Sequence, residues 1–259
     1  MTAGANRIFV IAQNTYREAV REKLLYNLFA FSTLMILSSI VLAKMHLGYD
    51  ERIYYDVGLA AIAFFGVLIA IFVGINLVYR ELAQKTVYTM LAKPVHRWEF
   101  VVGKYAGLVS LLALEIGMMA ALFMLVVWYK DTQFPIQLLY AIGLIFMELV
   151  LITAVALFFS SFTTPYLAAM FTVGLWIIGH LLADIRDFGN LPDAAGIRPI
   201  TQALYWGLPN LDRLDLKGPA AAGQVIELGT VLSRALYALL YSAMLLIGAV
   251  ALFQRRDFR

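Results

Sequence analysis

Two carboxylates, Glu115 and Glu148, lie near the middle of long apolar runs of the sequence. An ionised carboxylate in the hydrocarbon core of a membrane costs on the order of several kcal/mol unless it is paired or hydrated, so such residues are functional candidates. We expect each to line a translocation path or to hold helices together through polar contacts. The candidate partners are Arg234, tyrosines and a second copy of the chain.

The other residue types that could do chemistry do not form a catalytic or metal-binding pattern. The chain has no cysteine, which excludes thiol catalysis, thiolate metal sites and disulfides. His46, His96 and His180 are far apart in sequence and lack metal-ligand spacing. The pair Gly103-Lys104 lacks both the earlier glycine and the following serine or threonine of a phosphate-binding loop. We therefore predict no catalytic residue, no metal site and no cofactor on this chain.

The composition places these residues in an integral membrane protein. The chain is 62% hydrophobic and only 14% charged, with a mean hydropathy of +0.81, which is far from the composition of a soluble domain. Runs of about 20 apolar residues predict membrane-spanning helices. The predicted spans are Leu24 to Ala43, Val57 to Tyr79, Tyr105 to Tyr129, Ile136 to Phe159, Tyr166 to Ala183 and Val231 to Phe253. The fold class is therefore all-α, with six transmembrane helices in one domain, 1–259.

Two segments outside the spans have helical patterns of their own. In residues 1–23 the apolar positions recur at helical spacing, which predicts an amphipathic helix in the membrane interface. They are Ile8, Phe9, Ala12, Tyr16, Ala19 and Val20. The long loop 184–230 contains Ile200, Leu204 and Leu208 beside Tyr205 and Trp206. This pattern predicts a short helix at the opposite interface, where aromatic rings prefer to lie.

Basic residues set the expected orientation. They gather in the N-terminal segment, the loop 80–104 and the C-terminal tail, whereas the opposite loops carry fewer in more sequence and add aspartates. Positively charged loops stay on the cytoplasmic side, so both termini are predicted to be cytoplasmic. The pI is near 9.0. We attribute the basic residues to orientation in an anionic membrane and not to binding of nucleic acid.

The loop 80–104 resembles a known family in the order and spacing of its residues. The matching positions are Glu81, Thr86, Leu91, Pro94, Arg97, Gly103 and Lys104. Their order and spacing resemble the pattern of ABC-2-type permeases, the type V exporter family. The tract from Leu91 to Lys104 looks most like the branch containing the permease of the copper-site assembly exporter for nitrous-oxide reductase.

The resemblance implies a permease subunit of an ATP-driven exporter in a bacterial or archaeal inner membrane. It implies a homodimer with two copies of a separate ATP-binding subunit, which would bind ATP and Mg. The loop would form a coupling helix that docks on this ATPase, and Pro94 would end the helix because it disfavours helical geometry at Lys93. The expected coupling residues are Glu81, Lys85, Thr86, Tyr88, Leu91, Pro94 and Arg97.

The cargo and the use of the ATPase motion stay open at this stage. A lipid-like or other amphipathic cargo is one candidate, and copper or sulfur species are another, although metal handling without cysteine would need Met, His or carboxylates. The alternative function is a scaffold or mechanotransmitting subunit that acts on an outer partner. The resemblance also suggests that the second and fifth spans lie at the dimer interface, where small residues such as Gly66, Ala168 and Gly174 would allow close approach.

Overall fold

The computed structural model describes residues 2–44, 50–83, 96–130, 135–191 and 196–255. Over these ranges the chain is helical and contains no strand, which confirms the all-α class. Six helices are long and apolar enough to cross a membrane. They are α2 (Lys23–Lys44), α3 (Asp50–Ala83), α5 (Arg97–Lys130), α6 (Ile136–Ser160), α7 (Pro165–Gly189) and α10 (Leu228–Arg255).

Helices α3 and α5 extend well beyond their predicted apolar spans. Helix α3 begins at Asp50 and not near Val57, and α5 begins at Arg97 and not near Tyr105. A hydrophobic run measures the thickness of the bilayer, whereas a helix continues for as long as its backbone bonds and side chains allow. Both ends of the loop 80–104 are therefore helical. The middle of that loop, with Lys85, Thr86, Tyr88, Leu91 and Pro94, lies outside the described residues.

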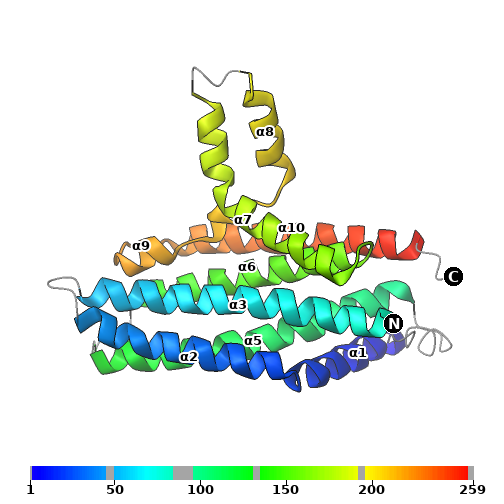
Figure 1. The fold of residues 1–259 in the computed structure, drawn as a ribbon, viewed down its shortest axis with the longest axis horizontal. Helices are drawn as coiled ribbons and strands as arrows, with labels where there is room; N and C mark the ends of the chain where they lie inside the picture. The colour runs from blue at the N-terminus through cyan, green and yellow to red at the C-terminus, as the bar shows by residue number, and fades with distance from the viewer. Residues whose placement is uncertain (1, 45–49, 84–95, 131–134, 192–195, 256–259) are drawn as a thin grey trace.

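Five of the long helices, α2, α3, α5, α6 and α10, run side by side, and both chain ends lie at the same end of this bundle (Figure 1). The most apolar windows of α3 and α6 are 72% buried, whereas those of α2, α7 and α10 are 22%, 22% and 17% buried. Helices α3 and α6 therefore form the centre of the bundle. The outer helices present apolar side chains to their surroundings, as expected of a protein whose solvent is lipid.

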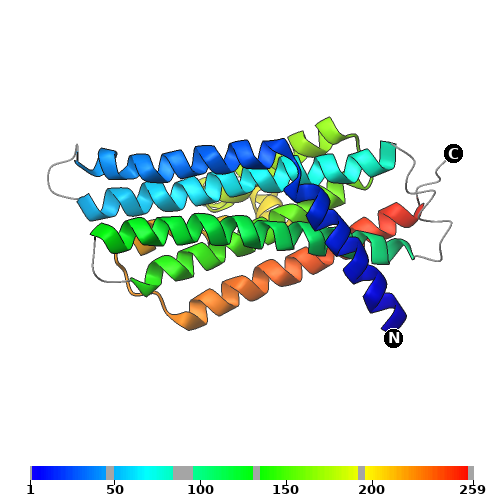
Figure 2. The same cartoon turned by 90° about the horizontal axis from the view of Figure 1, so that it is seen from below.

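Helix α1 (Thr2–Val20) crosses one end of the bundle obliquely and contacts α5 (Figure 2). Two glycines one turn apart on α5 allow this contact. A Cβ on Gly103 would lie 2.7 Å from Ile11 Cγ2, and one on Gly107 would lie 2.6 Å from the backbone oxygen of Ala12. The helix predicted for residues 1–23 is thus present, and one side of it packs on α5.

Helix α7 leaves the bundle partway along its length. Figure 1 shows that its first part follows the bundle, whereas its C-terminal part stands away beside α8 (Arg198–Gly207). Gly179 lies within α7, and its backbone oxygen accepts a hydrogen bond of 3.0 Å from the N–H of Leu211. A glycine, together with an outside group bonded to the helix backbone, explains a sharp bend. The C-terminal part of α7 and α8 are called the α7–α8 hairpin below.

The chain returns to the bundle after α8. The predicted short helix around Leu204 is confirmed, but the following residues are buried. Leu211, Leu214 and Leu216 are 0%, 1% and 6% exposed. Leu214 ends the short helix η2 (Asp212–Leu214), Leu211 precedes it, and Leu216 precedes α9 (Lys217–Ala221); both short helices pack on the bundle. The sequence did not predict this, because the segment is too short and irregular to show a period.

The glycine contact between α1 and α5 generates a test. We expect Gly107→Ala to lower the free energy of unfolding by about 1–3 kcal/mol, because the new methyl overlaps backbone that cannot move aside easily. Gly117→Ala is the matched control on the same helix, since nothing lies within 4 Å of a Cβ there. This control should be neutral or stabilising by up to about 1 kcal/mol through helix propensity. The free energies of unfolding of the two variants are measured on purified protein in detergent. Equal changes for Gly107→Ala and Gly117→Ala would contradict the close contact.

Candidate functional site

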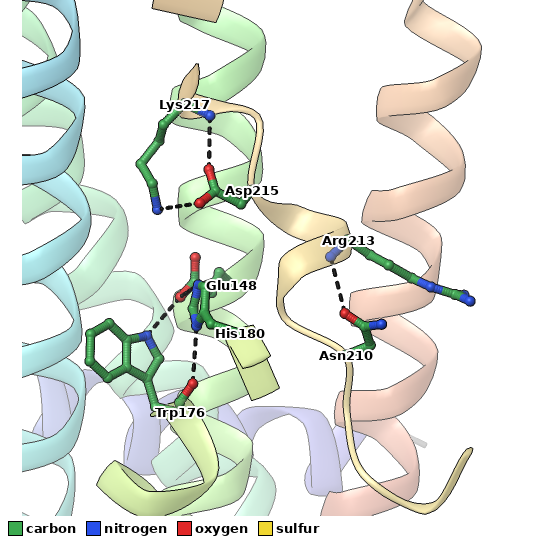
Figure 3. Close-up of polar contacts among 7 residues, drawn as sticks. All are labelled: Glu148, Trp176, His180, Asn210, Arg213, Asp215 and Lys217. Atoms are coloured by element: carbon green, nitrogen blue, oxygen red, sulfur yellow. Dashed lines mark hydrogen bonds and ion pairs between the residues drawn. The ribbon is translucent and has the colours of Figure 1, made fainter. Parts of the chain in front are cut away.

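Glu148 of α6 forms a buried polar contact with two residues of α7. Its side chain is 2% exposed, and its Oε1 accepts a hydrogen bond of 2.9 Å from Trp176 Nε1. His180 Nε2 lies 3.4 Å from the same oxygen. Trp176 and His180 are four residues apart, so they project from one face of α7. Figure 3 shows both side chains directed at Glu148.

The contacts of His180 indicate which of its ring nitrogens carries hydrogen. Its Nδ1 lies 3.0 Å from the backbone oxygen of Trp176, and since that oxygen can only accept, Nδ1 must carry a hydrogen to bond it. Nε2 then attracts Glu148 only if it is also protonated, or if the carboxyl itself carries the proton. The Glu148–His180 contact therefore joins α6 to α7 beside the Trp176 hydrogen bond.

A second charged pair lies beside this carboxylate. Lys217 Nζ is 3.1 Å from Asp215 Oδ2, and the backbone N–H of Lys217 donates to Asp215 Oδ1 at 2.9 Å. Figure 3 places this pair next to Glu148, on the segment that returns from the α7–α8 hairpin. Oε2 of Glu148 has no hydrogen-bond partner within the described part of the chain. The carboxylate therefore retains capacity for a further donor.

Hydrogen bonds also hold the returning segment to α8 and α10. Arg213 Nη2 donates to the Tyr205 hydroxyl at 3.1 Å, which holds the pKa of Tyr205 below its ordinary value. The backbone N–H of Asn210 donates to the Tyr237 hydroxyl at 2.8 Å. The Arg186 guanidinium lies 4.5 Å from the centre of the Tyr205 ring, which is the distance of a cation–π contact. These contacts fix the base of the hairpin.

Glu115 lies in the bundle without a comparable cluster. It is 1% exposed, and its Oε2 has no partner among the described residues. A Cβ on Gly66 of α3 would lie 3.1 Å from Ile116 and 2.6 Å from Leu149. Since these residues follow Glu115 and Glu148 directly, both carboxylates lie near the level of Gly66, on neighbouring helices.

The structure differs from the sequence prediction in the partners of these carboxylates. In the described ranges no hydrogen bond or ion pair joins Arg234 to Glu148 or to Glu115. Glu148 has Trp176 and His180 as its partners. Neither residue was predicted as a site residue, because neither one alone indicates a polar site. Their spacing of four on a predicted span was the available signal, since it places an indole N–H and an imidazole on one helix face.

The start of α5 forms a second candidate site, next to the loop of predicted coupling residues. Glu99 is 2% exposed, and its Oε2 accepts a hydrogen bond of 3.0 Å from the N–H of His96, as the glutamate of a capping box does. Arg7 Nη1 of α1 lies 3.7 Å from the same oxygen. Lys104 is also 2% exposed, and its Nζ lies 3.9 Å from Glu18 Oε2 of α1.

These ion pairs fasten α1 to the first turns of α5 through one acid and one base from each helix. Of the predicted coupling residues, Arg97 is the first residue of α5 and Glu81 lies in the last turn of α3. The others fall outside the described residues. In the part of the chain that the structure describes, no group of three or more His, Cys, Asp or Glu side chains is placed to hold a metal ion.

The contact between Trp176 and Glu148 generates a test. We expect Trp176→Phe to lower the free energy of unfolding by about 1–3 kcal/mol, because a buried carboxylate loses a hydrogen-bond donor. The matched control is Trp206→Phe in α8, where the side chain is 75% exposed. Thermal unfolding of both variants in detergent is the measurement. A loss no larger at position 176 than at position 206 would contradict a stabilising role for this hydrogen bond.

Comparison with known proteins assigns a family to this fold. A family model described as ABC-2 family transporter protein matches residues 8–258, which is nearly the whole chain. The match does not single out the copper-site assembly branch. A search of the curated proteins found no match.

Proposed function

Because the chain belongs to the ABC-2 transporter family, it is the membrane subunit of an ABC transporter, and we propose that it forms the translocation path of an exporter as a homodimer. The family match over residues 8–258 carries the proposal, together with six helices able to cross a membrane. ATP hydrolysis belongs to the ABC ATP-binding partner. We further propose two copies of that partner, with ATP and Mg bound there, and an inner-membrane location with both termini cytoplasmic.

We propose that the ATPase docks on the stretch between α3 and α5. The contacts of α5 support this, because force applied at Arg97 reaches α1 through Glu99 and Lys104, which are buried and paired. Helices α1 and α5 would therefore move together. The proposed coupling residues are those predicted from the sequence, Glu81, Lys85, Thr86, Tyr88, Leu91, Pro94 and Arg97.

The contact between α6 and α7 is the proposed point of conformational change. A transporter alternates between states only if some contacts differ between them. Glu148 suits this role, because one of its oxygens is held by α7 while the other has no hydrogen-bond partner among the residues that the structure describes. Lys217 is a nearby donor that could take over in a second state, exchanging Asp215 for Glu148.

The homodimer is supported by apolar surface on α7 and on the hairpin. Exposed side chains there include Leu181, Phe188, Ile200 and Trp206, at 46%, 59%, 61% and 75%. The small residues predicted for the interface separate into two groups. Ala168 is buried within the chain, and Gly66 meets Leu149 of its own bundle, whereas nothing lies within 4 Å of a Cβ on Gly174. The proposed interface therefore narrows to the outward face of α7.

The cargo that we propose is lipid-like or amphipathic. The described long helices are mainly apolar, and Glu115 and Glu148 are buried carboxylates within them. Export of copper or sulfur species, as in the copper-site assembly branch, is the narrower proposal drawn from the tract Leu91 to Lys104. The second candidate function is a mechanotransmitting scaffold that acts on an outer partner. The α7–α8 hairpin favours it, because it projects from the bundle and exposes apolar residues.

Docking of the ATPase is tested by charge reversal. We expect Glu81→Lys combined with Arg97→Glu to reduce the co-purified ATPase by at least about tenfold, because like charges at an interface cost several kcal/mol. The matched control is Glu227→Lys with Arg198→Glu. Arg198 begins α8 and Glu227 directly precedes α10, so both lie outside the stretch between α3 and α5. Pull-down from membranes gives the amounts. ATPase retained equally by both double variants would count against docking at this stretch.

The role of the buried carboxylates is tested by amide substitution. We expect Glu148→Gln to assemble with the ATPase but to lower ATP hydrolysis by the reconstituted complex about tenfold, within the usual range of a coupling energy. An amide accepts the Trp176 hydrogen bond but cannot exchange a proton with His180. Glu115→Gln is compared in the same assay, and exposed Glu227→Gln is the control. Failure of Glu148→Gln to assemble would assign this residue a structural role only.

A further inference from the structure

A groove runs between α1 and α5 on the surface of the protein. Its volume is about 560 Å³, within the range of roughly 300–1,000 Å³ found for small-molecule sites. It is lined from α1 by Ile8, Phe9, Ala12 and Tyr16, and from α5 by Ala106 and Ser110. We propose that this groove binds one acyl chain of an anionic membrane phospholipid, whose phosphate lies against basic residues at the end of α1.

The position of the groove specifies lipid as the occupant. Ala106 and Ser110 belong to the apolar stretch of α5 that is able to span the membrane, and α1 crosses the end of the bundle beside it (Figure 2). Residues of α1 that line the groove also form the apolar stripe expected to face the bilayer. An apolar groove of this kind does not hold water well, so the hydrocarbon chain of a lipid is the molecule available to fill it.

Most of the lining is apolar, and the side chains in it that carry polar atoms are Gln13 and Tyr16 of α1 and Ser110 of α5. Ser110 is the polar residue on the α5 side, and its hydroxyl already donates to the Ala106 backbone oxygen at 2.7 Å. Phe9 is 66% exposed and forms part of the wall. In water this exposure would be unfavourable by roughly 25 cal/mol per Å² of apolar surface. Contact with an acyl chain removes that surface from water.

Charge at the end of α1 specifies the headgroup. Arg17, Arg21 and Lys23 are exposed and follow the groove within two turns of Tyr16. Arg17 lies four residues after Gln13, which also lines the groove, so it continues the same helix face. Two acids are neighbours in sequence: Glu18 is directed to Lys104 of α5, and Glu22 lies between Arg21 and Lys23, so basic residues outnumber acids here. The basic residues therefore provide a site for a phosphate and a net negative headgroup.

Native mass spectrometry of the full chain in detergent tests the site. The probes are phosphatidylglycerol and phosphatidylcholine with the same acyl chains. We expect one phosphatidylglycerol retained per chain, in preference to phosphatidylcholine. Arg17→Gln should reduce this preference about fivefold, because one basic residue near an anionic lipid surface contributes about 1 kcal/mol. Arg198→Gln on α8 should leave the preference unchanged. Equal retention of the two lipids by the unaltered protein would overturn the headgroup assignment.

Filling the groove tests the acyl-chain part. We expect Ala106→Trp and Ala5→Trp to abolish the retained lipid, whereas Leu240→Trp, on the exposed face of α10, should keep it. Ala5 is exposed at the rim of the groove, so its variant decides the matter if Ala106→Trp does not fold. Lipid retained equally by all three tryptophan variants would show binding around the bundle in general and would overturn the site. The assay needs no ATPase, so it is independent of the exporter proposal.

Discussion

The contact of Glu148 with Trp176 and His180 is the constraint on which the second half of the molecule depends. It fixes α7 to the central helix α6 through residues on either side of Gly179, and the C-terminal part of α7 stands away from the bundle. The segment 208–221 then packs on the bundle and bonds to the Gly179 backbone. A carboxylate at this depth is tolerated only with polar partners, and α7 can provide them only while it lies against α6. The chemistry of one side chain thus ties the position of α7 to the path of the chain up to α10.

The apolar runs predicted the number and order of the long helices, because a bilayer allows only segments that satisfy their own backbone hydrogen bonds. They did not predict where the helices end. Asp50 and Arg97 begin helices several residues before the predicted spans, because a hydrophobic run measures the thickness of the bilayer and not the length of a helix. The burial of Leu211 and Leu214 was also not predictable, because a few residues carry no period and depend on distant helices for their contacts.

The candidate site was predictable in part for a related reason. Glu148 and Glu115 were found because a charge in an apolar run is rare, which is a property of the local sequence. The partners of Glu148 are contacts across 28 residues or more, and Trp176 and His180 are individually common in interfacial segments. Only their shared spacing carried information. For the coupling stretch the reverse holds: its order of residues identified the family, whereas the buried pairs from Glu99 and Lys104 to α1 needed the fold.

The two candidate sites differ in how firmly they hold their helices, and this difference has a mechanical meaning. Helix α1 is held on α5 by two glycines in backbone contact and by two pairs that each contain a buried charge, an arrangement that resists sliding because dense packing and paired buried charges have no second position nearby. Helix α7 contacts α6 through the ring pair of Phe171 with Phe159 and through one carboxylate, whose Oε2 has no hydrogen-bond partner among the described residues. Local stability in proteins is uneven, and moving elements come from its lower end. Force entering at α5 would therefore carry α1 with it, and relative movement would occur first where α7 meets α6.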